Sequence, residues 1–171
     1  IIEKYDRFFI LDDDIVIGVE DINAMFKISR EYDLEICGPS FTEEGKISHP
    51  VTRHKPNRLL SYTNFVENNV PLFSKEALGK LMEKIDNTLF GWGIDFLYII
   101  CNGLDKKKSY AIIHKIKCVN PFNKDKKIKK REWNNIEGVN KEQKNWIEFS
   151  KINNILDTFP RKVYDSIKDD N

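Results

Sequence analysis

Hydrophobic and polar positions along the chain form two kinds of pattern, short apolar runs and apolar stripes at helical spacing. Short runs rich in β-branched and aromatic residues predict strands, and apolar residues spaced three or four apart predict helices. The runs lie at 7–11, 34–40, 47–52, 62–74 and 109–120. The helical patterns lie at 20–32, 75–86, 95–104 and 141–157. This alternation predicts an α/β domain with a mixed sheet and flanking helices.

The first run, 7–11, ends on three consecutive aspartates, Asp12, Asp13 and Asp14. Because the run is continuously apolar after Arg7, we expect a fully buried strand. Ligands of open α/β sheets bind beyond the carboxyl ends of the strands. Side chains near a strand end alternate in direction, so Asp12 and Asp14 can converge on a Mg²⁺ or Mn²⁺ ion. A solvated acidic turn is the alternative interpretation.

A second candidate site is the glycine-punctuated sequence "FGWGID", residues 90–95. Gly91 and Gly93 allow a ligand to approach the backbone, and Trp92 can stack on the face of a sugar. Asp95, at the start of the next predicted helix, can accept the proton of a hydroxyl group. The structural alternatives are a core position for Trp92 and a helix N-terminal acid for Asp95. Together with the aspartates, the loop favours a functional interpretation.

These motifs stand in the order and spacing of one family. The sequences "DDDI", "SHPVT", "TNFVENNVPLFS", "FGWGID" and "CNG" before a strand resemble a DUF-type family of proposed glycosyltransferases. Its plant members are described as lysine-ketoglutarate-reductase trans-splicing-related proteins, and its fold is GT-A-like. The resemblance covers roughly residues 5–123. It implies a metal-dependent glycosyltransferase that moves a sugar from a nucleotide-sugar donor to an acceptor hydroxyl, by analogy of fold and motif.

The resemblance also implies roles for individual residues. The implied donor-binding residues are Asp12, Asp13 and Asp14, with Asp12 and Asp14 as ligands of a manganese or magnesium ion. The implied acceptor-binding residues are His49, Gly91, Trp92 and Gly93. Asp95 is implied as the catalytic base or acceptor-binding acid, and Glu67 as a further catalytic carboxylate in the pocket. For Glu67 a structural role, satisfying backbone donors inside a buried strand, is an equal alternative.

The chain departs from the family in two positions and in its N-terminal part. His114 stands where relatives carry an aspartate, and Asn120 where they carry a histidine that is a further metal ligand. An amide oxygen binds Mn²⁺ more weakly than imidazole, so we expect Asn120 to be a weaker ligand. His114, six positions away along the strand, should not reach the same point.

A GT-A fold places much of its nucleotide site before the DxD sequence, and only eleven residues precede Asp12. The N-terminal nucleotide-binding part is therefore expected to be largely missing. Residues 1–123 would form the DxD-to-acceptor half of the domain. Residues 124–171 would add a basic loop, with its cationic run at 124–131, and a C-terminal helix of the same domain.

Two other functions fit parts of the sequence. A hydrophobic strand followed by D-x-D-x-V is also typical of aspartyl phosphotransferases and phosphatases, with Asp12 as nucleophile and Asp14 as acid–base partner. That chemistry needs an acidic pair on a later strand, and 109–117 contains no acid. The third hypothesis is a non-catalytic carbohydrate-binding scaffold, which Asn120 and the short N-terminal part favour.

Composition narrows the expected partners and location. The 28 basic and 27 acidic side chains leave a net charge of +1, which argues against a nucleic-acid partner. No apolar run approaches the ~20 residues of a membrane-spanning helix. Cys37, Cys101 and Cys118 lack a CxxC spacing, so we expect reduced thiols in a cytoplasmic protein. The expected partners are a nucleotide sugar and a carbohydrate or other hydroxyl acceptor.

Overall fold

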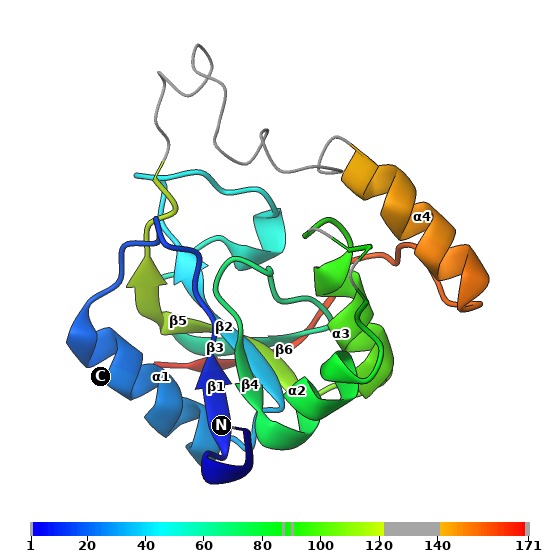
Figure 1. The fold of residues 1–171 in the computed structure, drawn as a ribbon. Helices are drawn as coiled ribbons and strands as arrows, with labels where there is room; N and C mark the ends of the chain where they lie inside the picture. Colours follow the sequence, from blue (N-terminus) through cyan, green and yellow to red (C-terminus); the bar gives the residue numbers. More distant parts are fainter. Residues whose placement is uncertain (1, 87, 90, 122–140, 170–171) are drawn as a thin grey trace.

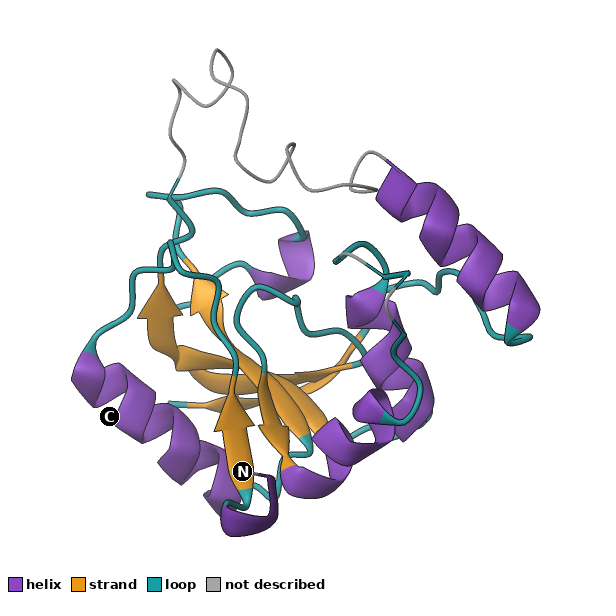
Figure 2. Cartoon of the chain, viewed as in Figure 1, coloured by secondary structure: helices purple, strands orange, loops and turns teal. Residues whose placement is uncertain are grey.

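The computed structural model describes residues 2–86, 88–89, 91–121 and 141–169 (Figures 1 and 2). The strands are β1 (Arg7–Phe9), β2 (Ile36–Phe41), β3 (Arg58–Thr63), β4 (Leu72–Ser74), β5 (Tyr110–Cys118) and β6 (Val163–Lys168). The helices are α1 (Val19–Glu31), α2 (Lys75–Met82), α3 (Ile94–Asn102) and α4 (Glu142–Ile152). Two short 3₁₀ turns span Ile2–Lys4 and Pro50–Thr52.

In the described part of the chain, the strands form a six-stranded sheet in the order β1-β4-β2-β5-β3-β6. Only the central pair β2–β5 is parallel, and the other neighbours are antiparallel. The prediction of an α/β domain with a mixed sheet and flanking helices is therefore confirmed. All four predicted helices are present, each within a few residues of the predicted bounds.

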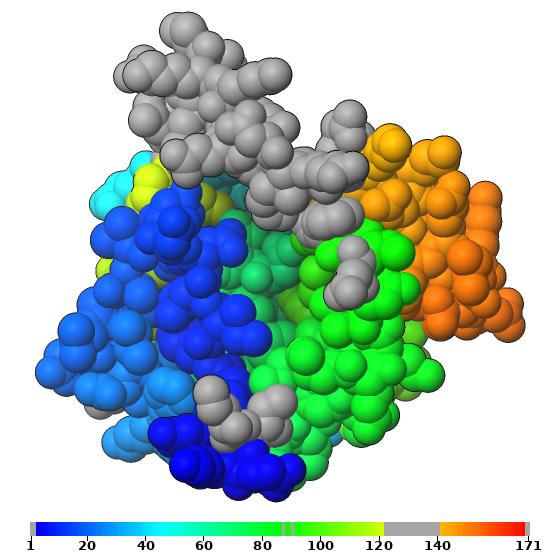
Figure 3. All heavy atoms as spheres, in the orientation of Figure 1, coloured from blue at the N-terminus to red at the C-terminus, as the bar shows by residue number. Residues whose placement is uncertain are grey.

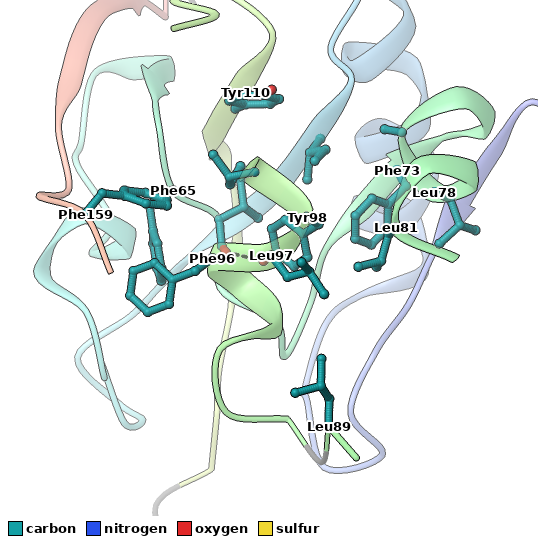
Figure 4. Packing of buried hydrophobic residues seen from close by; sticks show 14 of the residues in the cluster. Phe65, Phe73, Leu78, Leu81, Leu89, Phe96, Leu97, Tyr98, Tyr110 and Phe159 are labelled. Atoms are coloured by element: carbon teal, nitrogen blue, oxygen red, sulfur yellow. Dashed lines mark hydrogen bonds between the residues drawn. The ribbon is translucent and has the colours of Figure 1, made fainter. Parts of the chain in front are cut away.

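Helices cover both faces of this sheet (Figure 1). Along β5, Tyr110 and Ile112 join a core cluster with α2, α3 and α4. The alternate residues Ala111 and Ile113 join the cluster that contains Met25 and Ile28 of α1. This alternation is the period-two pattern of a strand buried on both faces. Figure 4 shows the first cluster around α3, where aromatic side chains from several segments meet.

The sequence-based boundaries were wrong in four places. Residues 47–52 do not form a strand; their only regular segment is the 3₁₀ turn Pro50–Thr52, because Pro50 lacks the N–H that a strand would use. The run 7–11 is not a fully buried strand: β1 ends at Phe9, is half-buried, and lies at the edge of the sheet. β3 begins before the predicted 62–74 run, and β6 was not predicted at all.

Three further expectations concern the chain as a whole. The basic run 124–131, predicted as a solvated loop, lies outside the described residues. None of the helices in the described ranges has both the length and the apolar character needed to span a membrane. The three cysteines are unpaired in the structure; Cys37 and Cys118 are buried and Cys101 is partly exposed. Beyond residue 140, β6 joins the sheet beside β3, so the C-terminal segment is part of the same sheet.

Candidate functional site

The three aspartates lie in the loop between β1 and α1, at the carboxyl end of β1 (Figure 1). Asp12 and Asp13 are exposed, and Asp14 is partly buried. The backbone N–H of Asp12 donates to the carbonyl of Asn69 at 2.9 Å, which ties this loop to the segment that follows Glu67. Two residues after Asp14, Val16 exchanges backbone hydrogen bonds with Val119 at 2.9 and 3.0 Å.

Asn120 lies beside this loop. Because Val16 and Val119 form an antiparallel bridge, Asn120 lies opposite Ile15, the residue that directly follows Asp14. Asn120 is 9% exposed, and its carbonyl accepts a hydrogen bond of 2.8 Å from the backbone of Lys46. The backbone of Asn120 therefore lies beside the end of the aspartate loop.

His114 is held elsewhere on β5. Its Nδ1 accepts from the backbone N–H of Lys55 at 3.3 Å, and its Nε2 lies 2.9 Å from the Ser61 hydroxyl. Both ring nitrogens are thus occupied by partners on and near β3. This agrees with the expectation that His114 does not reach the position of Asn120.

The aspartate loop is electrostatically suited to a cation. Partial burial raises the pKa of Asp12, and the neighbouring carboxylates of Asp14 and Asp13 raise it further. A bound cation would relieve this repulsion. Carboxylate oxygens fit Mg²⁺ and Mn²⁺, which usually take one or two carboxylates together with water and substrate phosphates. Among the described residues, no three His, Cys, Asp or Glu side chains converge as a ready-made metal site.

Glu67 is a buried carboxylic acid in the loop between β3 and β4, and not in a strand as predicted. Its side chain is 4% exposed. Burial raises its pKa to about 7, and the carboxylate of Asp95 contributes to the rise. Hydroxyl groups of Ser48 and Thr52 act in the opposite direction as hydrogen-bond partners. Glu67 is therefore poised between its protonated and ionised forms at neutral pH.

Asp95 lies in the first turn of α3 and is 8% exposed. Burial raises its pKa to about 6, while hydrogen bonding from the Phe96 N–H and the nearby Arg161 partly offset this. Its Oδ2 lies 4.0 Å from Nε2 of His49. Burial lowers the pKa of His49 to about 4, so the imidazole is neutral at pH 7. The two groups are neighbours in one site and do not form an ion pair.

The glycine loop before Asp95 needs its two glycines for backbone reasons. Gly91 and Gly93 have φ values of 118° and 87°, a region that disfavours side chains. A Cβ on Gly93 would lie 2.1 Å from the indole of Trp146. The bare backbone of Gly93 is therefore covered by α4 of the same chain, and this packing accounts for that glycine. Trp92 is 49% exposed and is not a core aromatic.

One short segment, residues 67–69, joins the two predicted sites. The Asn69 carbonyl accepts from Asp12, as described above, and the Asn68 side-chain amide donates to the Gly91 carbonyl at 2.9 Å. Glu67 directly precedes Asn68, and the charge of Asp95 contributes to its raised pKa. The aspartate loop and the segment leading into α3 accordingly lie on one face of the molecule, blue and green in Figure 3. Segment 67–69 thus contacts both the aspartate loop and the glycine loop that precedes α3.

Two charged residues of the site were not predicted. Arg161, between α4 and β6, acts electrostatically on both Asp95 and His49. Lys46 acts on both Glu67 and His49. Lys46 lies three residues before His49, but no local pattern distinguishes it from other exposed lysines. Arg161 carries no sequence signal, because its place depends on packing between distant segments.

Comparison of the chain with protein-family models, with curated proteins and with solved structures finds no match.

Proposed function

We propose that this chain forms the cation-binding and acceptor-binding part of a metal-dependent glycosyltransferase with a GT-A-like fold. The observation that carries the proposal is the contact of segment 67–69 with both loops. It links the aspartate loop to the glycine loop that leads to Asp95, and its first residue is the buried carboxyl group Glu67. A transfer reaction needs both parts: charge compensation for a diphosphate leaving group and a base for the acceptor hydroxyl.

In this mechanism Asp12 and Asp14 would hold the cation, with Asn120 as a further, weaker ligand. Bound there, the ion would neutralise negative charge on the departing diphosphate. Asp95 accepts the proton of the acceptor hydroxyl as its oxygen forms a bond to the anomeric carbon. The bond between that carbon and the diphosphate oxygen breaks, and its electron pair leaves with the diphosphate. A pKa of about 6 leaves most Asp95 side chains ionised, and able to take the proton, at pH 7.

The roles of the other residues follow from their positions. Neutral His49, whose Nε2 lies 4.0 Å from Oδ2 of Asp95, can accept or donate a hydrogen bond to the acceptor. Trp92, half-exposed between the two glycines, offers an aromatic face for a sugar ring. Glu67 and Asp95 are two neighbouring carboxyl groups, and Glu67 changes their combined charge because it holds or releases its own proton near pH 7.

The proposal is tested by a Mn²⁺ titration followed by thermal unfolding, with and without UDP or GDP. The variants are Asp12→Asn/Asp14→Asn and, as a control of equal charge change, Glu31→Gln/Glu83→Gln at exposed positions of α1 and the end of α2. We expect Mn²⁺ to raise the melting temperature, nucleotide to raise it further, and only the aspartate double variant to lose both effects. A metal response that survives in this variant would place the cation elsewhere and refute the proposal.

A further inference from the structure

Arg161 lies near Asp95, and its guanidinium group lies over two aromatic rings. Its guanidinium carbon is 4.4 Å from the ring centre of Phe65 and 5.3 Å from that of Phe96. His49 contacts the same Phe65 ring edge-to-face, with ring centres 4.7 Å apart. Arg161 and His49 therefore share one aromatic neighbour, and Phe96 is the residue directly after Asp95.

The backbone on both sides of Arg161 is fixed by Asn64. The Asn64 amide donates to the Pro160 carbonyl at 2.9 Å, and its oxygen accepts from the Lys162 N–H at 2.7 Å. Phe159 anchors the same segment, because its ring packs edge-to-face on Phe96 at 5.0 Å (Figure 4). The position of Arg161 is thus set before any ligand binds, which reduces the entropy cost of binding.

The guanidinium donors of Arg161 point to no carboxylate partner within the described ranges. Arg161 is exposed, and no ion pair to it forms among those residues, although its charge reaches Asp95. A second exposed cation, Lys46, acts on His49 as well. The buried carboxyl groups therefore have cations beside them whose charge is available to a ligand.

We propose that Arg161 binds an anionic group, a carboxylate or a phosphate, on the acceptor whose hydroxyl reacts at Asp95. This inference rests on the proposed function and adds the class of acceptor. Guanidinium groups bind carboxylate and phosphate through two parallel hydrogen bonds, and the stacking on Phe65 leaves its N–H edge available. An anionic acceptor placed beside Glu67 and Asp95 without such a cation would be repelled by them.

The test is an NMR titration of the ¹⁵N-labelled chain with three small probes. Methyl β-glucuronide and glucose 6-phosphate carry the two kinds of anion, and methyl β-glucoside is the neutral comparator. We expect at least one anionic probe to bind about tenfold tighter than the glucoside and to shift amides around Asp95. Arg161→Gln should abolish this preference. Lys162→Gln, which removes the same charge one residue away, should preserve it.

Three outcomes would overturn the inference: no binding of either anionic probe, no preference over the glucoside, or a preference that survives in Arg161→Gln. If Arg161→Gln instead weakens UDP–Mn²⁺ binding about tenfold, Arg161 serves the donor diphosphate. The inference then fails while the proposed function stands. An Arg161-dependent preference in a chain without any Mn²⁺ response would support the anion site and refute the donor site.

Discussion

At the residue scale, the most informative group is the buried carboxyl of Glu67. Its pKa is raised from 4.5 to about 7 in the folded protein, so folding favours the protonated form. At low pH the group is protonated in both the folded and the unfolded protein, so the pKa shift does not affect stability. As the pH rises from about 4.5 to 7, the unfolded state releases this proton while the folded state retains it, and the free energy of unfolding falls. Since each tenfold change in proton affinity corresponds to about 1.4 kcal/mol, the total loss is about 3 kcal/mol.

Glu67→Gln removes this pH-dependent loss because the amide is neutral throughout. The free energy of unfolding in urea should therefore be compared at pH 4.5 and pH 8. Relative to the wild type, the variant should be about 3 kcal/mol more favourable at pH 8 than at pH 4.5. Glu44→Gln, at an exposed position, should differ from the wild type by nearly the same amount at both pH values. Parallel pH curves for Glu67→Gln and the wild type would show that Glu67 titrates normally.

The sequence predicted those site residues whose chemistry is visible locally. Asp12 and Asp14 follow an apolar run, and Asp95 follows paired glycines, so residue type and spacing were enough to nominate them as candidates. The relative placement of their two loops depends on contacts between distant segments: the Asn68 amide donates to the Gly91 carbonyl, and the Asn69 carbonyl accepts from the Asp12 N–H. Arg161 could not be predicted from the sequence for the same reason, because its position is set by Asn64, 97 residues earlier in the chain.

At the element scale, the start of α2 is defined by a side-chain cap. Ser74 is the last residue of β4, and its hydroxyl accepts a hydrogen bond of 3.1 Å from the N–H of Ala77. Ser74→Ala should lower the free energy of unfolding by about 1 kcal/mol, measured in urea, because the donor loses its partner. Ser74→Thr keeps the hydroxyl and should retain most of the stability. Equal losses in both variants would assign the effect to packing rather than to capping.

The elements predicted correctly are those with strong local signals. All four helices carry an amphipathic or strongly apolar stripe, and β2 and β5 are apolar runs buried in the centre of the sheet. β6 was missed because no residue of its sequence "VYDSIK" is fully buried, and it forms an edge. The segment 47–52 was misjudged because its apolar residues serve loop packing: Ile47 packs against a small cluster that includes Phe41 and Cys118.

At the scale of the whole molecule, α4 is held to the start of α3 through one close contact. The indole of Trp146 covers Gly93, and its Nε1 donates to the Asp157 carbonyl at 2.7 Å. Trp146 is 1% exposed and continues the aromatic stack from Phe96. The C-terminal segment thus braces the loop that presents Asp95, while Arg161 in the same segment reaches the site. Residues beyond 140 are therefore part of the site's architecture.

This brace predicts a large difference between two glycine substitutions at the ends of α3. Gly93→Ala and Gly103→Ala both place a side chain at positive φ, 87° and 105°, which costs about 1–3 kcal/mol at each position. At Gly103 the new Cβ would meet nothing closer than the Lys106 side chain at 3.6 Å. At Gly93 it would overlap Trp146, so we expect a total loss of about 3 kcal/mol or more.

Urea unfolding followed by circular dichroism measures both losses, and tryptophan fluorescence of the folded variants is compared in a Trp92→Phe background, which removes the signal of the residue beside Gly93. The fluorescence should change in Gly93→Ala and stay unchanged in Gly103→Ala, because only the first substitution displaces the indole. Equal losses of stability for the two variants would mean that α4 moves away from Gly93 without cost. In that case the C-terminal segment does not brace Asp95, and the rigid placement of Arg161 would have to come from Asn64 and Phe159 alone.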